Sequence, residues 1–113
     1  MKQRLLDTPQ ERIPVELAVQ VREFCEPLDL IASSYIGLFE ITEDFKYPRE
    51  QLAVAFEIRA PTAHNRADDP ELRRVAERFY ESMPADVAAG GCNFLAPGAL
   101  AAWHEKAWQV FAR

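Results

Sequence analysis

Large apolar residues alternate with small or charged ones along residues 52–59, at Leu52 and at every second position after it. A period of two predicts a β-strand with one bulky and one small face. Residues 30–41 are also apolar and rich in β-branched and aromatic side chains, which favours a second strand covered on both faces. The polar stretch between them, residues 42–51, is too long for a tight turn. We therefore predict a β-hairpin joined by an open loop. Phe45 and Tyr47 of that loop are expected to pack back onto the sheet, and contact with a partner is the alternative.

Helical periodicity surrounds this hairpin. From Leu17, apolar side chains recur at i+4, i+7 and i+11, which predicts an amphipathic helix over residues 14–27. Helical spacing returns in residues 70–83, where Asp69 stands before a proline and a glutamate and supplies a capped helix start. A last helix is predicted over residues 99–112, where two tryptophans would dock it firmly.

The remaining segments complete the predicted order of elements. Residues 85–96 predict a third strand with a kink at its two adjacent glycines. Residues 1–13 are polar, and Pro14 would stop any helix begun there, so we expect a flexible arm followed by one domain over residues 14–113. The predicted fold is α+β, in the order α-β-β-α-β-α, with a three-stranded, largely antiparallel sheet packed by helices. Such a sheet has two free edges, which invite edge-to-edge dimerisation.

Composition and charge restrict the classes of function. The chain has 113 residues, of which 49% are hydrophobic and 27% charged, as in an ordinary globular domain. Acidic residues outnumber basic ones by 18 to 13, which gives a formal net charge of −5. This sign disfavours nucleic acid and an anionic membrane surface as partners. The sequence shows no signal peptide, no membrane span and no C-x-x-C pair, so we expect a cytoplasmic protein with reduced thiols.

Few residues are candidates for catalysis or metal binding. Cys92 would need a histidine within hydrogen-bond reach to act as a nucleophile, and its apolar surroundings favour an inert, buried thiol like Cys25. Glu57 is a carboxylate within an apolar strand, where Arg59 two residues later suggests a structural ion pair. His64 lies in a polar loop near aspartates that could bind a metal, but a solvated histidine is the simpler interpretation.

Two further features resemble known motifs only superficially. His104 lies in Trp-His-Glu-Lys, but the zinc-protease pattern H-E-x-x-H is absent because position 108 is tryptophan. We expect His104 to pack against Trp108 on the predicted helix. The Gly90-Gly91 pair belongs to no phosphate-binding motif. We therefore predict no catalytic residue, no metal site and no cofactor.

Three segments of the sequence carry a resemblance to a known family. Ser34-Tyr-Ile-Gly-Leu-Phe and Leu52-Ala-Val-Ala-Phe-Glu-Ile follow a helix that begins at Pro14-Val-Glu-Leu and ends near Pro27. A helix after an acidic loop and a closing aromatic helix complete the pattern over residues 14–111. In these features the chain resembles the C-terminal domain of the enhanced serine sensitivity protein family. That family is named for a phenotype, and the resemblance implies no reaction.

The leading functional hypothesis is a non-enzymatic, cytoplasmic protein-interaction module that forms a homodimer or binds another protein. A related hypothesis is a small acidic chaperone for a secreted effector. The rival class is a small enzyme that uses Cys92 or Glu57 in a pocket. We expect contacts with a partner at the loop of residues 42–51, at the loop of residues 60–69 or along a free strand edge.

Overall fold

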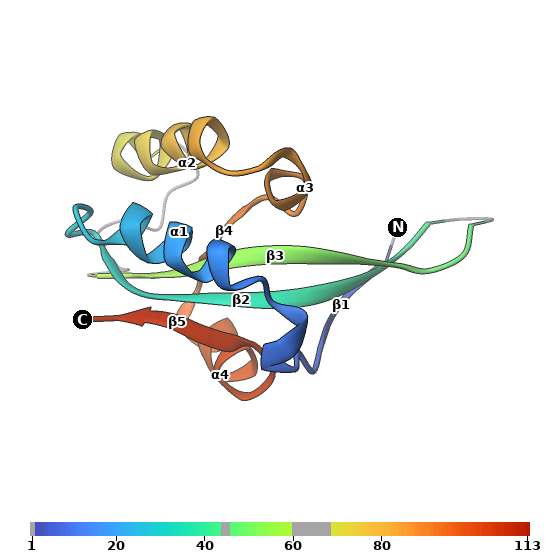
Figure 1. The fold of residues 1–113 in the computed structure, drawn as a ribbon. Coiled ribbons are helices and arrows are strands. Elements are labelled where there is room, and N and C mark those ends of the chain that lie inside the picture. The colour runs from blue at the N-terminus through green and yellow to red at the C-terminus, as the bar shows by residue number, and fades with distance from the viewer. Residues whose placement is uncertain (1, 44–45, 60–68) are drawn as a thin grey trace.

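The computed structural model describes residues 2–43, 46–59 and 69–113. Figure 1 shows strands at the centre and helices on both sides, so the predicted α+β class is confirmed. In chain order the elements are β1 (Lys2–Leu6), a 3₁₀ turn (Gln10–Arg12), α1 (Val15–Cys25), β2 (Ile31–Thr42), β3 (Arg49–Ile58), α2 (Pro70–Ser82), α3 (Ala85–Ala88), β4 (Cys92–Leu95), α4 (Pro97–Lys106) and β5 (Trp108–Ala112).

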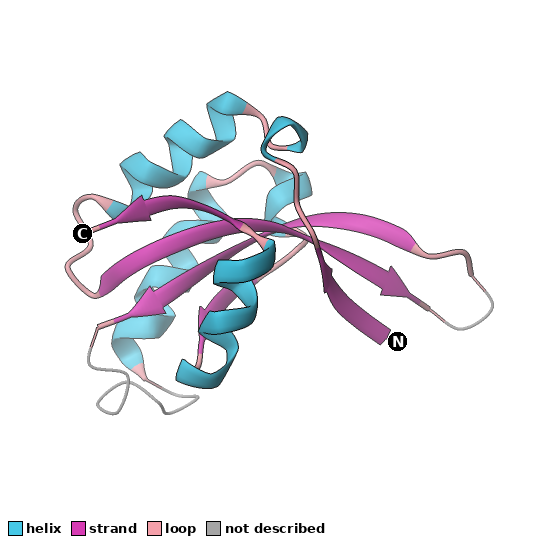
Figure 2. Ribbon diagram, turned by 90° about the horizontal axis from the view of Figure 1, so that it is seen from below, coloured by secondary structure: helices cyan, strands magenta, loops and turns pink. Residues whose placement is uncertain are grey.

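β2 is the central strand of a mixed sheet. β3 runs antiparallel along one side of β2, and β4 pairs with β3 in parallel. Two strands share the other side of β2: β1 lies opposite residues 38–42 and β5 lies opposite residues 33–36, both antiparallel. β1 and β5 therefore follow one another along the same edge, as Figures 1 and 2 show.

The sheet has five strands in the described part of the chain, so the prediction of three was too low. The prediction of a flexible arm over residues 1–13 is wrong for Lys2–Leu6, which pair with β2 as β1. β1 carries Lys2 and Arg4, and charged residues are common on edge strands because they hinder pairing with another chain. The same charges remove the alternating apolar pattern by which a strand is predicted from sequence.

Two predicted elements are divided in the structure. The predicted last helix over residues 99–112 is too long, because α4 ends at Lys106 and the chain continues as β5. The predicted strand over residues 85–96 is replaced by the short helix α3 followed by β4. Gly91 makes the turn between α3 and β4 with a φ of 81°, a conformation that glycine adopts without steric cost.

Each face of the sheet has its own core. α1, α2 and α3 lie on one face and α4 lies on the other (Figure 1). Val54 and Phe56 of β3 are buried in the core beneath α1 and α2, whereas Ala53 and Ala55 are buried beneath Trp103 of α4. The predicted strand with one bulky and one small face is therefore confirmed.

α4 approaches the sheet closely because Gly37 of β2 has no side chain. A β-carbon at Gly37 would lie 3.0 Å from both Trp103 Cζ3 and Leu5 Cδ1. Trp103 is 6% exposed and meets the ring of Phe39 edge-on, with centroids 5.5 Å apart. A glycine within a strand often marks a place where another group comes close to the backbone, and here that group is the side chain of Trp103.

Side chains form hydrogen bonds with three main-chain groups at the edges of the sheet. On these edges Arg22 Nε donates to the carbonyl of Val110 at 2.7 Å, Lys106 Nζ to the carbonyl of Leu5 at 3.5 Å, and the amide of Cys92 to the hydroxyl of Tyr80 at 3.1 Å. A second chain that paired with these edges would have to displace the side chains first. At these three positions the side chains hinder pairing with a second chain.

Candidate protein-binding groove

Both thiols are poorly placed for nucleophilic chemistry. Burial raises the pKa of Cys25 to about 12, although the Ser34 hydroxyl and the Arg113 guanidinium act in the opposite direction. Burial also raises the pKa of Cys92 to about 12, with a smaller contribution from Cys25. Since the thiolate is the reactive form, these thiols are held in the unreactive one.

Glu57 does not form the ion pair expected with Arg59. Its carboxylate accepts a hydrogen bond of 2.8 Å from the hydroxyl of Ser33, its neighbour across the strands. Glu57 follows Ala53 and Ala55 on the α4 face of the sheet, whereas Cys92 packs against the core on the α1 face. The sheet thus separates the two residues that were the candidates for catalysis.

His104 belongs to no metal-binding cluster of the described residues. The Nδ1 atom of His104 lies 3.3 Å from the hydroxyl of Tyr35, and the expected contact with Trp108 on one helix is wrong because Trp108 belongs to β5. His64 lies outside the described residues. Within residues 2–43, 46–59 and 69–113, no group of three or more His, Cys, Asp or Glu side chains is arranged to hold a metal ion.

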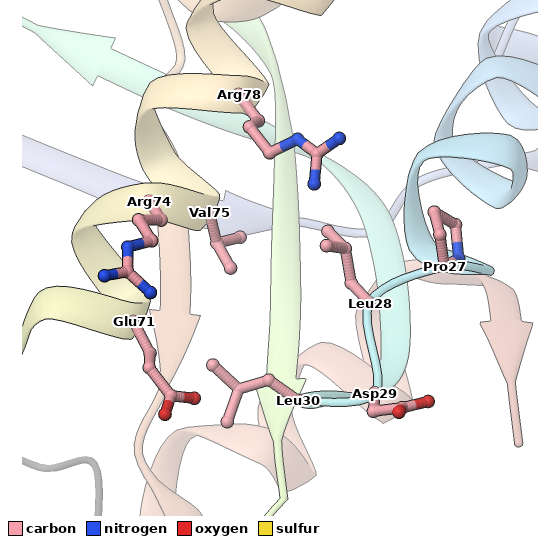
Figure 3. A pocket seen from close by; sticks show the side chains of 8 residues that line it. All are labelled: Pro27, Leu28, Asp29, Leu30, Glu71, Arg74, Val75 and Arg78. Atoms are coloured by element: carbon pink, nitrogen blue, oxygen red, sulfur yellow. The ribbon is translucent and has the colours of Figure 1, made fainter.

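A groove of about 280 Å³ lies between α2 and the turn at residues 27–30, which joins α1 to β2 (Figure 3). Its floor is apolar and comes from both sides. Leu28 and Leu30 enter from the turn and Val75 enters from α2. Arg78 extends from α2 across the opening toward the turn.

Local structure fixes both walls of the groove. On α2, Glu71, Arg74, Val75 and Arg78 follow the helical repeat and therefore share one face. Asp69 caps this helix by accepting from the amides of Glu71 and Leu72, as its sequence predicts.

The opposite wall is the turn at residues 27–30, and hydrogen bonds to its main-chain carbonyls hold it in place. The Arg59 amide donates to the carbonyl of Leu30 at 2.8 Å, and Arg113 Nη2 donates to the carbonyl of Leu28 at 2.8 Å. Arg113 also donates to the carbonyl of Cys25 at 2.8 Å, at the negative end of the α1 dipole. A turn held by this many hydrogen bonds needs little reordering when a partner binds.

The arginines on the rim are available to a ligand. Arg74 and Arg78 are exposed, and neither has a hydrogen bond or ion pair to any residue that the structure describes. A guanidinium group offers a planar set of donors that matches a carboxylate. Asp29 and Glu71, on the same rim, carry the opposite charge. The groove can therefore bind an apolar side chain whose flanking residues are charged.

Sequence reasoning missed this site. The charged run on α2 predicts only a solvated helix face, and the sequence favours the loops of residues 42–51 and 60–69 for contacts with a partner. Tyr47 in the first loop is 95% exposed, so the expectation that it packs onto the sheet is wrong. Phe45 and residues 60–68 lie outside the described residues. A signal for the groove exists only in Leu28 and Leu30, two large apolar residues in a turn.

Comparison of the chain with protein-family models, with curated proteins and with solved structures found no significant match. Function is therefore inferred from the chemistry of the groove and of the surrounding surface.

Proposed function

We propose that this chain is a non-enzymatic protein-interaction module that binds a short segment of another protein in the groove between α2 and the turn at residues 27–30. The observation that carries the proposal is the pair of arginines, Arg74 and Arg78, that stand beside an apolar floor without a partner among the described residues. Unpaired guanidinium groups beside an apolar groove can bind a negatively charged group of a partner. Arginines that served only the stability of the fold would be expected to form ion pairs within it.

The size of the groove favours a peptide over a cofactor. Pockets for drug-sized ligands and cofactors occupy roughly 300–1,000 Å³. A groove of about 280 Å³ is slightly smaller than that range and accommodates one or two side chains of a partner. Its rim carries both signs of charge, which gives a bound segment a preferred orientation.

Several further features of the proposal come from the sequence. A cytoplasmic location suits two free thiols. None of the helices in the described part of the chain is long and apolar enough to cross a membrane. Homodimer formation, through a free strand edge or a face of the molecule, is retained as part of the proposal. The chaperone-like role and membership of the enhanced serine sensitivity family stay predictions.

The proposal is tested by selecting peptides from a displayed random library on the intact protein and measuring their affinity for variants. Arg78→Glu reverses a charge on the groove, and Arg73→Glu makes the same change five residues earlier on α2, outside the groove. We expect selected peptides to bind Arg78→Glu at least about tenfold more weakly, a loss of about 1.4 kcal/mol, and Arg73→Glu almost normally. Failure to enrich any peptide, or an equal loss in both variants, would contradict the proposal.

A further inference from the structure

α1 presents an apolar stripe to solvent on the side away from α2. Val15 is 71% exposed and Val19, one turn later, is 42% exposed. Val15 also lines a cavity of about 370 Å³ with Ile13 and the half-buried Trp108 of β5. Scattered apolar residues are normal on a surface, but these side chains adjoin one another and a hollow.

Carboxylates surround this stripe. Glu11 lines the cavity, and Glu16 and Glu23 flank the two valines on α1. All three are exposed, and their carboxylates have no hydrogen bond or ion pair to the described residues.

Of the two nearby arginines, one is paired with a carboxylate and the other keeps its positive charge. The guanidinium of Arg12 pairs with Glu50 of β3, and Arg22 donates to the carbonyl of Val110. The three carboxylates outnumber the single uncompensated arginine, so the local surface is apolar with a net negative rim, and the net charge of −5 adds a longer-range field of the same sign.

We propose that α1 and β5 form a second docking surface, which binds a basic amphipathic segment of a partner protein. Apolar side chains of that segment would cover Val15 and Val19 and enter the hollow beside Trp108. Lysines or arginines flanking them would lie against Glu11, Glu16 and Glu23. A second copy of this chain is a poorer occupant, because a symmetric contact would bring two negative rims together.

This surface is separate from the groove described above. Its apolar part comes from the N-terminal half of α1 and from β5, whereas the groove begins at the turn after the C-terminal end of α1 and faces α2. Figure 1 shows β5 and α2 on opposite sides of α1. The groove carries arginines and this surface carries carboxylates, so the two surfaces select partner segments of different charge.

The test uses a labelled peptide of leucines and lysines in helical repeat as the probe, with a leucine–glutamate peptide of the same pattern as its counterpart. Fluorescence anisotropy measures binding of each peptide to the intact protein. We expect the leucine–lysine peptide to bind, with an affinity that falls as salt is raised, and the leucine–glutamate peptide to bind at least about tenfold more weakly.

Two matched double variants distinguish binding of the peptide at this surface from general attraction of a basic peptide to an acidic protein. Glu16→Lys with Glu23→Lys changes the rim of the stripe, and Glu77→Lys with Glu81→Lys makes the same change in net charge on α2. We expect the first pair to weaken peptide binding at least about tenfold and the second to weaken it less than about threefold. Equal losses in the two variants would overturn the proposal.

The apolar part of the surface is tested by Val15→Ser with Val19→Ser, which replaces exposed side chains and should leave the fold intact. We expect weaker binding of the leucine–lysine peptide and an unchanged affinity for peptides selected on the groove. If light scattering instead shows that the unaltered protein is a dimer that this variant dissociates, the occupant is a second copy and the proposal of a basic partner is wrong.

Discussion

The thiol of Cys25 lies at the C-terminal end of α1, under the side chain of Arg113. Two neighbours favour its thiolate: Ser34 through a hydrogen bond and Arg113 through its charge. Burial outweighs both, and the pKa rises from 9.0 to about 12. Loss of the thiol proton therefore costs more in the folded protein than in the unfolded chain.

This shift makes stability depend on pH in the alkaline range. Below pH 9 the thiol is neutral in both states and adds no pH dependence. Between about pH 9 and 12 the unfolded chain has lost the proton that the folded protein keeps, so the free energy of unfolding falls as pH rises. We expect this one group to contribute up to about 1.4 kcal/mol per pH unit.

Urea unfolding at pH 7 to 10.5 measures the effect, with Cys25→Ala as the comparison. The variant loses stability at every pH because it leaves a cavity, but its curve should fall less steeply above pH 9. Lysines and tyrosines titrate in both proteins and cancel in the difference. Parallel curves would show that the thiol does not carry this dependence.

At the scale of elements, sequence pattern predicts well where one element buries a regular face. α1, α2 and β3 have periodic patterns, and β2 is a long apolar run rich in β-branched and aromatic residues. The structure contains each of them near the predicted bounds. β1 and β5 are short edge strands that gain their structure by pairing with β2. In residues 108–112 the aromatic spacing fits a helix as well as a strand, and pairing with β2 decides between them.

The contact between α3 and β3 yields a prediction at this scale. A β-carbon on Gly90, just after α3, would lie 2.3 Å from the carbonyl oxygen of Leu52 and 3.2 Å from Ala53 Cα. Both are backbone atoms of β3, so α3 would have to move away from the sheet. We expect Gly90→Ala to destabilise the protein by about 1–3 kcal/mol, measured by urea unfolding.

Gly98 in α4 offers the matched control, because a β-carbon there meets nothing within 4 Å. Gly98→Ala should leave stability unchanged or raise it by up to about 1 kcal/mol, since alanine favours the helix. Equal effects of the two substitutions would mean that the closeness of α3 to β3 is not what requires glycine at position 90.

At the scale of the whole molecule, the sequence indicates the fold class but not the candidate site. The groove forms where the turn after α1 meets α2, and the two segments are far apart in the chain. No local sequence pattern predicts that these two segments lie next to each other. The residues that sequence reasoning favoured for chemistry are instead divided between the two faces of the sheet, with Cys92 on one and Glu57 on the other.

Cys25 is buried and Cys92 is partly buried, and their surroundings predict how the whole molecule responds to a thiol reagent. With a pKa near 12, about one Cys92 side chain in ten thousand is a thiolate at pH 8, against about one in ten at the ordinary pKa of 9.0. We expect a disulfide reagent at pH 8 to react on the order of a thousandfold faster with the urea-unfolded chain than with the native protein. Native reactivity of Cys25 should follow unfolding, because this buried thiol becomes accessible when α1 leaves the sheet. A Cys92 that reacts rapidly in the native protein, while Cys25 does not, would instead favour the cysteine enzyme over the interaction module.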